Sequence, residues 1–265
     1  MPNSKNRYAQ IIETIFLNKY QAGLTEIAFE RLEITRVARK LKIKLPKNLG
    51  DILYSFRYRT QLPVSISRKA PKGSAWIIRP AGRARYKFVL AAEVEIVPSK
   101  LLVETKIPDA TPGIIAKYSL NDEQALLAKI RYNRLIDIFT GLTCYSLQNH
   151  LRTTVASLGQ VETDEIYVGI DKRGVHYVLP VQAKSKADRI GIVQIEQDFA
   201  VGAEKFSRLV CRPIATQFIG EDTIALFEFE QTETGIGIAS EKHYRLVHPD
   251  KLTTEELVSY QDRTS

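Results

Sequence analysis

The sequence has few cysteines and no long apolar run. Cys144 and Cys211 are the only two cysteines among 265 residues, too few and too isolated for a disulfide framework or a zinc cluster. No apolar run approaches the roughly 18–20 residues that a membrane-spanning helix needs, and residues 1–7 have no apolar core of a secretory signal behind them. We therefore expect a cytoplasmic protein without membrane contact, whose cysteines are small buried residues.

Acidic residues are absent from Leu53 to Ala92. Nine cations lie in this stretch: Arg57, Arg59, Arg68, Lys69, Lys72, Arg79, Arg83, Arg85 and Lys87. Six aromatic residues are interleaved with them: Tyr54, Phe56, Tyr58, Trp76, Tyr86 and Phe88. Lysine and arginine neutralise phosphates, and aromatic rings stack on bases, so the stretch is expected to bind nucleic acid. The alternative is a solvated basic face over a small aromatic core.

The charge is divided unevenly along the chain. Residues 1–110 hold 21 Lys and Arg against 9 Asp and Glu, a net charge of +12. Residues 111–265 hold 17 Lys and Arg against 21 Asp and Glu, a net charge of −4. This predicts a basic nucleic-acid-binding domain over residues 1–110 and a second domain with a different function over residues 111–265.

Apolar periodicity predicts three helices and a basic hairpin in the N-terminal domain. The helices are expected over residues 7–19, 25–43 and 49–58, and strand-like pieces over 64–67, 75–79 and 86–97. This order resembles a winged helix, in which the third helix enters a DNA groove and the wing lies along the backbone. A small α+β domain without a groove-reading helix is the alternative.

The C-terminal domain is expected to follow the order helix, strands, helix, strands. The expected ranges are a helix to residue 139 with a second helical segment through 152, strands 161–170 and 175–184, a helix 189–206, and strands 209–219 and 223–230. The short turn at 172–174 implies an antiparallel hairpin, and the helix after it permits a parallel crossover. The polar residues of that crossover helix, Gln194, Glu196, Gln197 and Asp198, are expected to be solvated, with a role near the active face as the alternative for Gln194 and Gln197, which share a side. His243 is expected at the surface of a polar tail.

The predicted hairpin carries a set of residues suited to a metal site. Asp164 lies on its first strand, while Gln182 and Lys184 share one face of the next strand, with Ala183 opposite. Hard cations such as Mg²⁺ bind carboxylate and carbonyl oxygens and lower the pKa of bound water. A neighbouring lysine stabilises charge that develops on a phosphate. Asp164, the Gln182 side-chain oxygen, the Ala183 carbonyl and Lys184 therefore predict an Mg²⁺ site for phosphodiester hydrolysis.

Asp164, followed after 17 residues by Gln182-Ala183-Lys184, resembles the motif of the PD-(D/E)XK nuclease superfamily, which includes many restriction endonucleases. The helix, strand hairpin and crossover helix of residues 120–230 are similar in order to that superfamily's core. The resemblance implies a restriction-endonuclease-like mixed β-sheet flanked by helices, in an α+β or α/β fold. It also implies that Asp164 and residue 182 bind Mg²⁺ and that Lys184 aids the nucleophilic water. The sequence departs from the motif at Thr163, where proline would stand, and at Gln182, where an acid would stand.

A neutral amide is a weaker metal ligand than a carboxylate, so another acid is expected to supplement the site. Glu162 shares the face of Asp164 in a regular strand, whereas Glu165 reaches that face, as a catalytic residue that replaces Asp164, if the strand contains a bulge. The alternative for both is solvation of an edge strand. Three candidate accessory residues precede the strand: Gln148, His150 and Arg152. His150 is a candidate general base near neutral pH, with a polar helix end as its alternative.

These features together predict an Mg²⁺-dependent endonuclease that hydrolyses double-stranded DNA sequence-selectively. The resemblance implies a role in restriction or another defence system. One active site per chain implies a homodimer for cutting both strands. Two alternatives stay open: a non-catalytic DNA-binding regulator whose C-terminal domain dimerises or binds a ligand, and an RNA-directed nuclease or RNA-binding protein.

Overall fold

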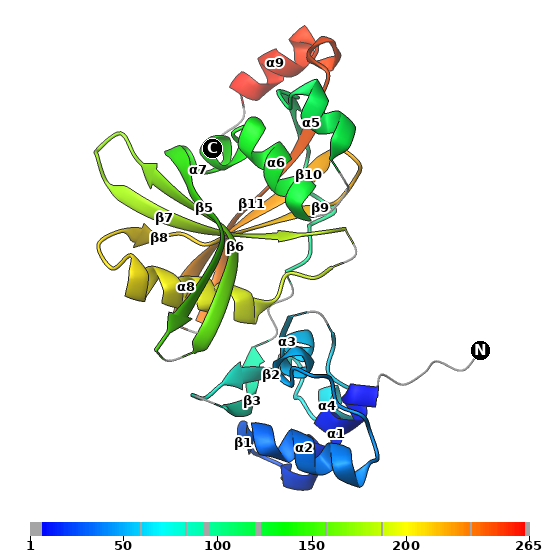
Figure 1. Cartoon of the computed structure of the whole chain (residues 1–265). Coiled ribbons are helices and arrows are strands. Elements are labelled where there is room, and N and C mark those ends of the chain that lie inside the picture. Colours follow the sequence, from blue (N-terminus) through cyan, green and yellow to red (C-terminus); the bar gives the residue numbers. More distant parts are fainter. Residues whose placement is uncertain are drawn as a thin grey trace, which may run out of the picture. The chain divides into compact units, whose positions relative to one another are not determined.

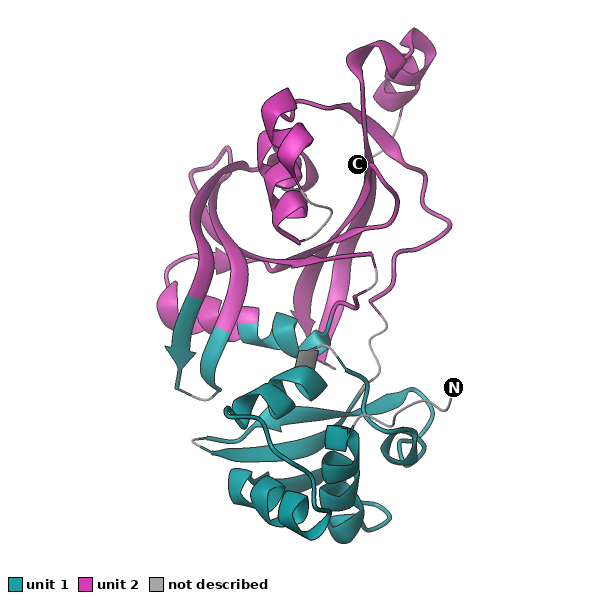
Figure 2. Cartoon of the chain, turned by 45° about the vertical axis from the view of Figure 1, so that its right-hand side comes forward, with its two compact units in different colours: residues 1–95, 152–161, 191–197 teal, residues 96–151, 162–190, 198–265 magenta. Residues whose placement is uncertain are grey.

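The computed structural model describes residues 7–58, 60–82, 84–92, 96–119, 123–156, 158–186, 188–233 and 235–262. The protein has a mixed α+β fold with one small and one large sheet (Figure 1). The chain divides into two compact units (Figure 2). Unit 1 comprises residues 1–95, 152–161 and 191–197, and unit 2 comprises residues 96–151, 162–190 and 198–265. Among the described helices, none is long and apolar enough to cross a membrane.

A three-stranded antiparallel sheet and four helices form most of unit 1. The elements are α1 (Arg7–Lys19), β1 (Glu26–Glu30), α2 (Arg31–Lys40), α3 (Gly50–Tyr58), α4 (Val64–Ser67), β2 (Ser74–Pro80) and β3 (Arg85–Ala92). The strands lie in the order β1-β3-β2, so that Phe88 pairs with Ile27 on one side and Ile78 on the other. All three of these side chains are buried, which places the core on one face of the sheet.

Two element assignments made from the sequence of this unit are wrong. Residues 25–43 do not form one helix. Glu26–Glu30 form the strand β1, whose residues alternate between exposed and buried, and α2 begins only after it. The side chain of Glu33 accepts a hydrogen bond from the backbone N–H of Glu30 (2.9 Å) and so marks the start of α2. Residues 64–67 form the short helix α4 after Pro63 rather than a strand.

Aromatic side chains that were expected to stack on bases fill the core of unit 1 instead. Phe56, Trp76 and Phe88 are buried. The ring of Phe16 lies 5.1 Å from those of both Trp76 and Phe88 in edge-on geometry, a favoured arrangement for buried aromatic pairs. The alternative of a small aromatic core is therefore correct for these three residues, and Tyr54 remains exposed.

The large sheet has eight strands, most of which belong to unit 2. They are β4 (Thr105–Pro108), β5 (Thr143–Val155), β6 (Gly159–Ile170), β7 (His176–Lys184), β8 (Val210–Cys211), β9 (Ile214–Phe218), β10 (Thr223–Thr232) and β11 (Gly235–Val247). The order is β4-β11-β10-β9-β7-β6-β5, with β8 paired to β7. β6 and β7 are antiparallel, whereas β7 and β9 are parallel. The sheet is curled and mixed (Figure 1).

Helices cover both faces of this sheet at β7. The remaining described helices of the chain are α5 (Gly113–Tyr118), α6 (Glu123–Tyr132), α7 (Leu135–Thr140), α8 (Ile192–Lys205) and α9 (Thr254–Gln261), with a short 3₁₀ turn η1 (Pro249–Lys251), and α6, α7 and α8 are the ones that pack against β7. Leu126 of α6 and Leu135 of α7 belong to one core cluster with Leu179 and Val181 of β7. On the other face α8 approaches Val178 through Gly202. Successive side chains of β7 therefore point toward different helices.

Two further assignments differ in the large sheet. The segment before β6 is the strand β5 and not a continued helix, so Gln148, His150 and Arg152 lie on a strand at the end of the sheet. Its Thr, Tyr and Val residues have the β-branched and aromatic side chains that are enriched in strands. The segment expected to be a polar tail forms β11, and its His243 is buried beside Glu241, with 2.8 Å between His243 Nε2 and Glu241 Oε1.

Replacing Gly202 by alanine is expected to destabilise the protein by about 1–3 kcal/mol, as overpacking of a core does. An added Cβ would lie 2.3 Å from Cys211 Sγ and 2.7 Å from Cys211 Cβ. This clash should outweigh the roughly 1 kcal/mol by which alanine favours a helix interior over glycine. Urea denaturation measures the change, with Gly113→Ala as the control because nothing lies within 4 Å of its added Cβ. Equal stability of Gly202→Ala and wild type would contradict the close approach.

Candidate active site

A fixed turn sets the register of the β6–β7 hairpin. The Asp171 carboxylate accepts hydrogen bonds from the backbone N–H groups of Val175 (2.9 Å) and Arg173 (2.8 Å). These bonds, led by the one from Val175, lower the pKa of Asp171 to about 2. Gly174 adopts a φ of +82°, which glycine reaches without steric cost. The turn leads into the paired residues Glu165 and Val181, next to the candidate site at the other end of the hairpin.

Asp164 reaches across from β6 to β7. Its Oδ2 accepts a hydrogen bond from the backbone N–H of Ala183 at 2.8 Å. Ala183 lies between Gln182 and Lys184, so the carboxylate meets β7 at the centre of the three-residue motif. The sequence therefore predicted correctly that Asp164 and this motif come together.

Asp198 is a site residue that the sequence reasoning missed. It lies on α8 and is fully buried, although it was expected to be solvated. Both of its oxygens accept from Gln182 Nε2, at 3.0 and 2.9 Å, and Oδ1 accepts from Thr163 Oγ1 at 2.6 Å. The helix thus places a carboxylate directly against the position where the motif has a neutral amide.

The electrostatics link Asp198 to Asp164 and Lys184. Burial raises the pKa of Asp198 to about 7, and the charge of Asp164 raises it as well. The hydrogen bonds from Thr163 and Gln182 and the charge of Lys184 lower it. Two carboxyl groups and one ammonium group therefore interact around Gln182. The ionisation of Asp198 depends on the charges of the other two groups, as is common in functional sites.

A usable sequence signal for Asp198 was its helical spacing. Gln194, Asp198 and Val201 recur at intervals of four and three residues, and all three are buried. Gly202, next to Val201, lies close against Cys211 of β8. Residues at this spacing share one face of a helix, so Asp198 faces the sheet with its apolar neighbours.

Glu162 lies beside the site and contacts His150. The distance between Glu162 Oε1 and His150 Nδ1 is 3.3 Å, and His150 Nε2 lies 3.1 Å from Gln124 Nε2 on α6. His150 has a φ of +49°, which is unusual for a residue within a strand. The structure thus brings His150 and Glu162 together, while Gln148 and Arg152 are exposed on β5, with Arg152 in unit 1.

Glu165 takes part in a separate buried ion pair. Its side chain is fully buried, and its Oε1 accepts hydrogen bonds from Arg131 Nε (3.1 Å) and Nη2 (2.9 Å) on α6. The hydroxyl of Ser146 on β5 donates to the same oxygen. A metal-binding role for Glu165 would require this pair to break, and removing one partner of a buried pair typically costs a few kcal/mol.

The donors near Gln182 suit a cation that keeps its own water. The described part of the chain contains no group of three or more His, Cys, Asp or Glu side chains arranged to hold a metal. Mg²⁺, however, usually binds through one or two carboxylates together with waters and substrate phosphate. Asp164 and Asp198 are two such carboxylates, and the pKa of Asp198 is raised first by burial and then also by the charge of Asp164. Glu162 is a further acid on β6, and Gln182 Nε2 lies 3.5 Å from its carbonyl oxygen.

The expected DNA-binding cations of unit 1 differ in whether their side chains are exposed and whether they are paired with acids. Arg59 and Arg83 lie outside the described residues. Arg79 pairs with Glu196 within unit 1, and Lys87 pairs with Glu26 at 2.7 Å. Arg57 is half-buried. The exposed members are Arg68, Lys69, Lys72 and Arg85, and Lys69 Nζ lies 5.5 Å from the ring centre of Tyr20.

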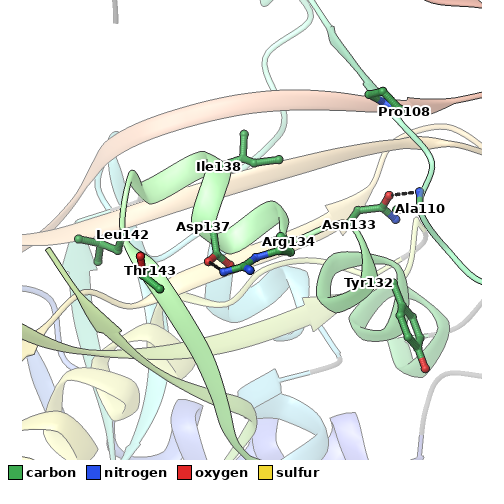
Figure 3. A pocket seen from close by; sticks show the side chains of 9 residues that line it. All are labelled: Pro108, Ala110, Tyr132, Asn133, Arg134, Asp137, Ile138, Leu142 and Thr143. Atoms are coloured by element: carbon green, nitrogen blue, oxygen red, sulfur yellow. Dashed lines mark hydrogen bonds and ion pairs between the residues drawn. The ribbon is translucent and has the colours of Figure 1, made fainter. Parts of the chain in front are cut away.

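A pocket of about 500 Å³ lies elsewhere in unit 2, beside α7 (Figure 3). Its lining is Pro108, Ala110, Tyr132, Asn133, Arg134, Asp137, Ile138, Leu142 and Thr143. The Asn133 side chain accepts from the Ala110 N–H at 2.7 Å, and Arg134 pairs with Asp137. The polar groups on this wall are thus engaged with one another, and no candidate catalytic residue lines the pocket.

A comparison of the chain with known proteins found no matching family model, no matching curated protein and no matching solved structure.

Proposed function

We propose that the protein is an Mg²⁺-dependent nuclease that cuts double-stranded DNA. The observation that carries the proposal is the position of Asp198, whose buried carboxylate is hydrogen-bonded to Gln182. Gln182 stands where the resembled motif has its second acid. Asp198 supplies a carboxylate at that position from a different element, so the shortage of negative charge in the motif is made up by α8.

Each residue of the site has a distinct role in the proposed reaction. Bound Mg²⁺ would supply a more acidic water and neutralise charge on the phosphate. Asp164 and Asp198 would hold the cation, and the Gln182 amide and Thr163 hydroxyl fix the carboxylate of Asp198 by hydrogen bonds. The ammonium group of Lys184 stabilises the developing negative charge of the phosphate and orients the attacking water.

The order of elements supports the restriction-endonuclease-like part of the proposal. Helices α6 and α7 are followed by β5, β6 and β7, then by the crossover helix α8 and the parallel strand β9. The helix, the β6–β7 hairpin and the crossover helix follow the order that the resemblance implied, whereas the strand β5 was not expected. Asp164 lies on the first strand of the β6–β7 hairpin and the Gln182-Ala183-Lys184 motif on the second, as expected.

The order of elements in unit 1 supports a winged-helix-like DNA-binding part. α1, β1, α2 and α3 precede the hairpin β2–β3, and β3 pairs between β1 and β2. The net charge of +12 over residues 1–110 suits a polyanionic partner. The proposed enzyme works as a homodimer, because one site in each chain then acts on each strand.

Incubation of the purified protein with supercoiled plasmid DNA and Mg²⁺ should give nicked or linear products with defined ends. The same DNA with EDTA should stay intact, and sequencing of the ends would reveal a recognition sequence and its sensitivity to methylation. Matched single-stranded RNA tests the RNA-directed alternative. Binding of DNA without cleavage under every metal condition would instead favour the non-catalytic regulator.

A further inference from the structure

A second acid-free stretch of unit 1 lies before the one that the sequence pattern first singled out. Between Glu33 and Asp51 there is no Asp or Glu. Six cations lie in it, and all six side chains are exposed: Arg36, Arg39, Lys40, Lys42, Lys44 and Lys47. We name this segment, residues 36–47, the basic segment.

The first half of the basic segment is the outward face of α2. Ile34 and Ala38 are the buried residues of this helix. Arg36 and Lys40 are four residues apart and lie together on the exposed side. Like charges at this spacing destabilise a helix by roughly 0.2–0.5 kcal/mol. Attraction to the negative end of the helix explains Arg39 and Lys40 in the last turn, but it leaves Arg36 unexplained.

The second half is held in place by its backbone and its apolar residues. The N–H of Leu41 donates to the carbonyl of Val37, and that of Ile43 donates to Ala38 (both 2.9 Å), which closes the helix around Lys42 in a left-handed conformation with φ of +55°. Ile43 and Leu45 pack against the core of unit 1. The alternation of Lys42, Ile43, Lys44 and Leu45 therefore directs the lysines outward.

The end of the loop is fixed as well. Asn48 Oδ1 accepts from the Gly50 N–H at 3.0 Å, and Asn48 Nδ2 donates to Asp51 Oδ1 at 2.7 Å. These bonds join the loop to the start of α3. The cations of the basic segment thus project from an ordered backbone, so that less conformational entropy is lost when they bind a ligand.

The six cations also lack acidic partners in the described structure. No ion pair joins any of them to an acid among the described residues, whereas Arg79 and Lys87 of the later stretch are paired with Glu196 and Glu26. A run of six exposed cations without intervening acids suits a partner that carries repeated negative charge. Nucleic-acid backbones have this chemistry.

We infer that the basic segment of residues 36–47 is a main phosphate-binding surface of the protein and contacts the backbone of double-stranded DNA. This inference rests on the proposed function for its choice of partner. It differs from the sequence-based assignment, which gave the role to cations between Arg57 and Lys87. Such contacts position DNA and add affinity without reading sequence.

The test measures DNA binding in EDTA, so that cleavage plays no part. The test variant carries Arg36→Gln, Lys40→Gln, Lys44→Gln and Lys47→Gln, and the matched control carries Lys117→Gln, Lys172→Gln, Arg208→Gln and Lys242→Gln, four exposed cations of unit 2. Each lost phosphate contact reduces the slope of log Kd against log salt by about 0.9. We expect the slope to fall by about 3–4 and Kd at 0.15 M salt to rise at least about tenfold, with wild-type behaviour in the control.

A charge-preserving variant separates loss of charge from loss of fold. Arg36→Lys with Lys40→Arg, Lys44→Arg and Lys47→Arg should keep the wild-type slope, and thermal unfolding should be the same for all variants. An unchanged slope in the neutralised variant, or equal losses in the control, would overturn the inference. The inference would also be overturned if the neutralised variant lost binding to vesicles of anionic lipid but still bound DNA like the wild type. Reduced DNA binding in a protein that never cuts DNA would leave the surface assigned and reject only the nuclease activity.

Discussion

Lys184→Gln should reduce Mg²⁺-dependent DNA cleavage by about 10²–10³-fold, the usual effect of removing one group that stabilises charge in a transition state. Lys184 lies at the end of β7, and its charge lowers the pKa of Asp198. Glutamine keeps most of the side-chain length but removes that charge. Single-turnover cleavage with protein in excess measures the chemical step separately from binding.

The control for this variant comes from the same hairpin. Lys172 is exposed in the turn between β6 and β7, and Lys172→Gln should cleave at the wild-type rate. DNA affinity in EDTA should change less than about twofold for Lys184→Gln, because one phosphate contact contributes only part of the binding. Wild-type cleavage by Lys184→Gln would remove this lysine from the proposed chemistry.

Asp198→Asn is expected to abolish cleavage and at the same time to stabilise the metal-free protein near neutral pH. Cleavage is lost because the variant lacks the carboxylate that stands in for an acid at Gln182. Stability is gained because ionised Asp198 is fully buried, and a buried charge without a cation is unfavourable. Asparagine has nearly the same shape and keeps one oxygen that can accept from Gln182 or Thr163.

The stability gain should depend on pH in a defined direction. Burial raises the pKa of Asp198 from its ordinary value of 3.8 to about 7 in the folded protein. Between about pH 4 and pH 7 the folded chain therefore binds more protons than the unfolded chain, and the free energy of unfolding falls as the pH rises. The fall amounts to roughly 4 kcal/mol for this group, so the advantage of Asp198→Asn should be small at pH 4 and largest above pH 7.

Addition of Mg²⁺ provides the matching measurement. A cation that binds the folded protein raises the apparent stability by mass action. Mg²⁺ should therefore raise the melting temperature of the wild type above pH 7 and have little effect on Asp198→Asn. Equal shifts in the two proteins would exclude Asp198 as a metal ligand, while a pH-independent stability difference would contradict the raised pKa.

Local patterns in the sequence predicted several parts of the fold correctly. The apolar spacing of residues 7–19 gave α1, and the turn residues around Gly174 gave the β6–β7 hairpin. The helix predicted after the second hairpin strand indicated a parallel crossover, and α8 does connect β7 to the parallel strand β9. These features depend on interactions between residues that are close in sequence, so short-range rules suffice for them.

Other parts depend on contacts between distant segments. β5 was wrongly predicted as a helix. Its strand conformation is stabilised by pairing with β6, and the sequence of β5 alone does not indicate which segment pairs with it. The aromatic residues near Trp76 looked suited to nucleic-acid bases, but their burial is decided by packing against Phe16 of α1. Whether a cation has an acidic partner is decided in the same way, because Arg79 pairs with the distant Glu196 and Lys87 with the distant Glu26.

The sequence by itself determined the alternation that puts Gln182 and Lys184 on one face of a strand, and the uneven charge of the two halves. Only the tertiary structure decided which carboxylate accompanies Asp164. Glu162 and Glu165 are its neighbours in sequence, yet Arg131 binds Glu165, and Asp198 arrives from α8 instead. Side-chain direction along a strand follows from the local backbone, whereas the approach of a helix to a sheet depends on packing across the whole domain.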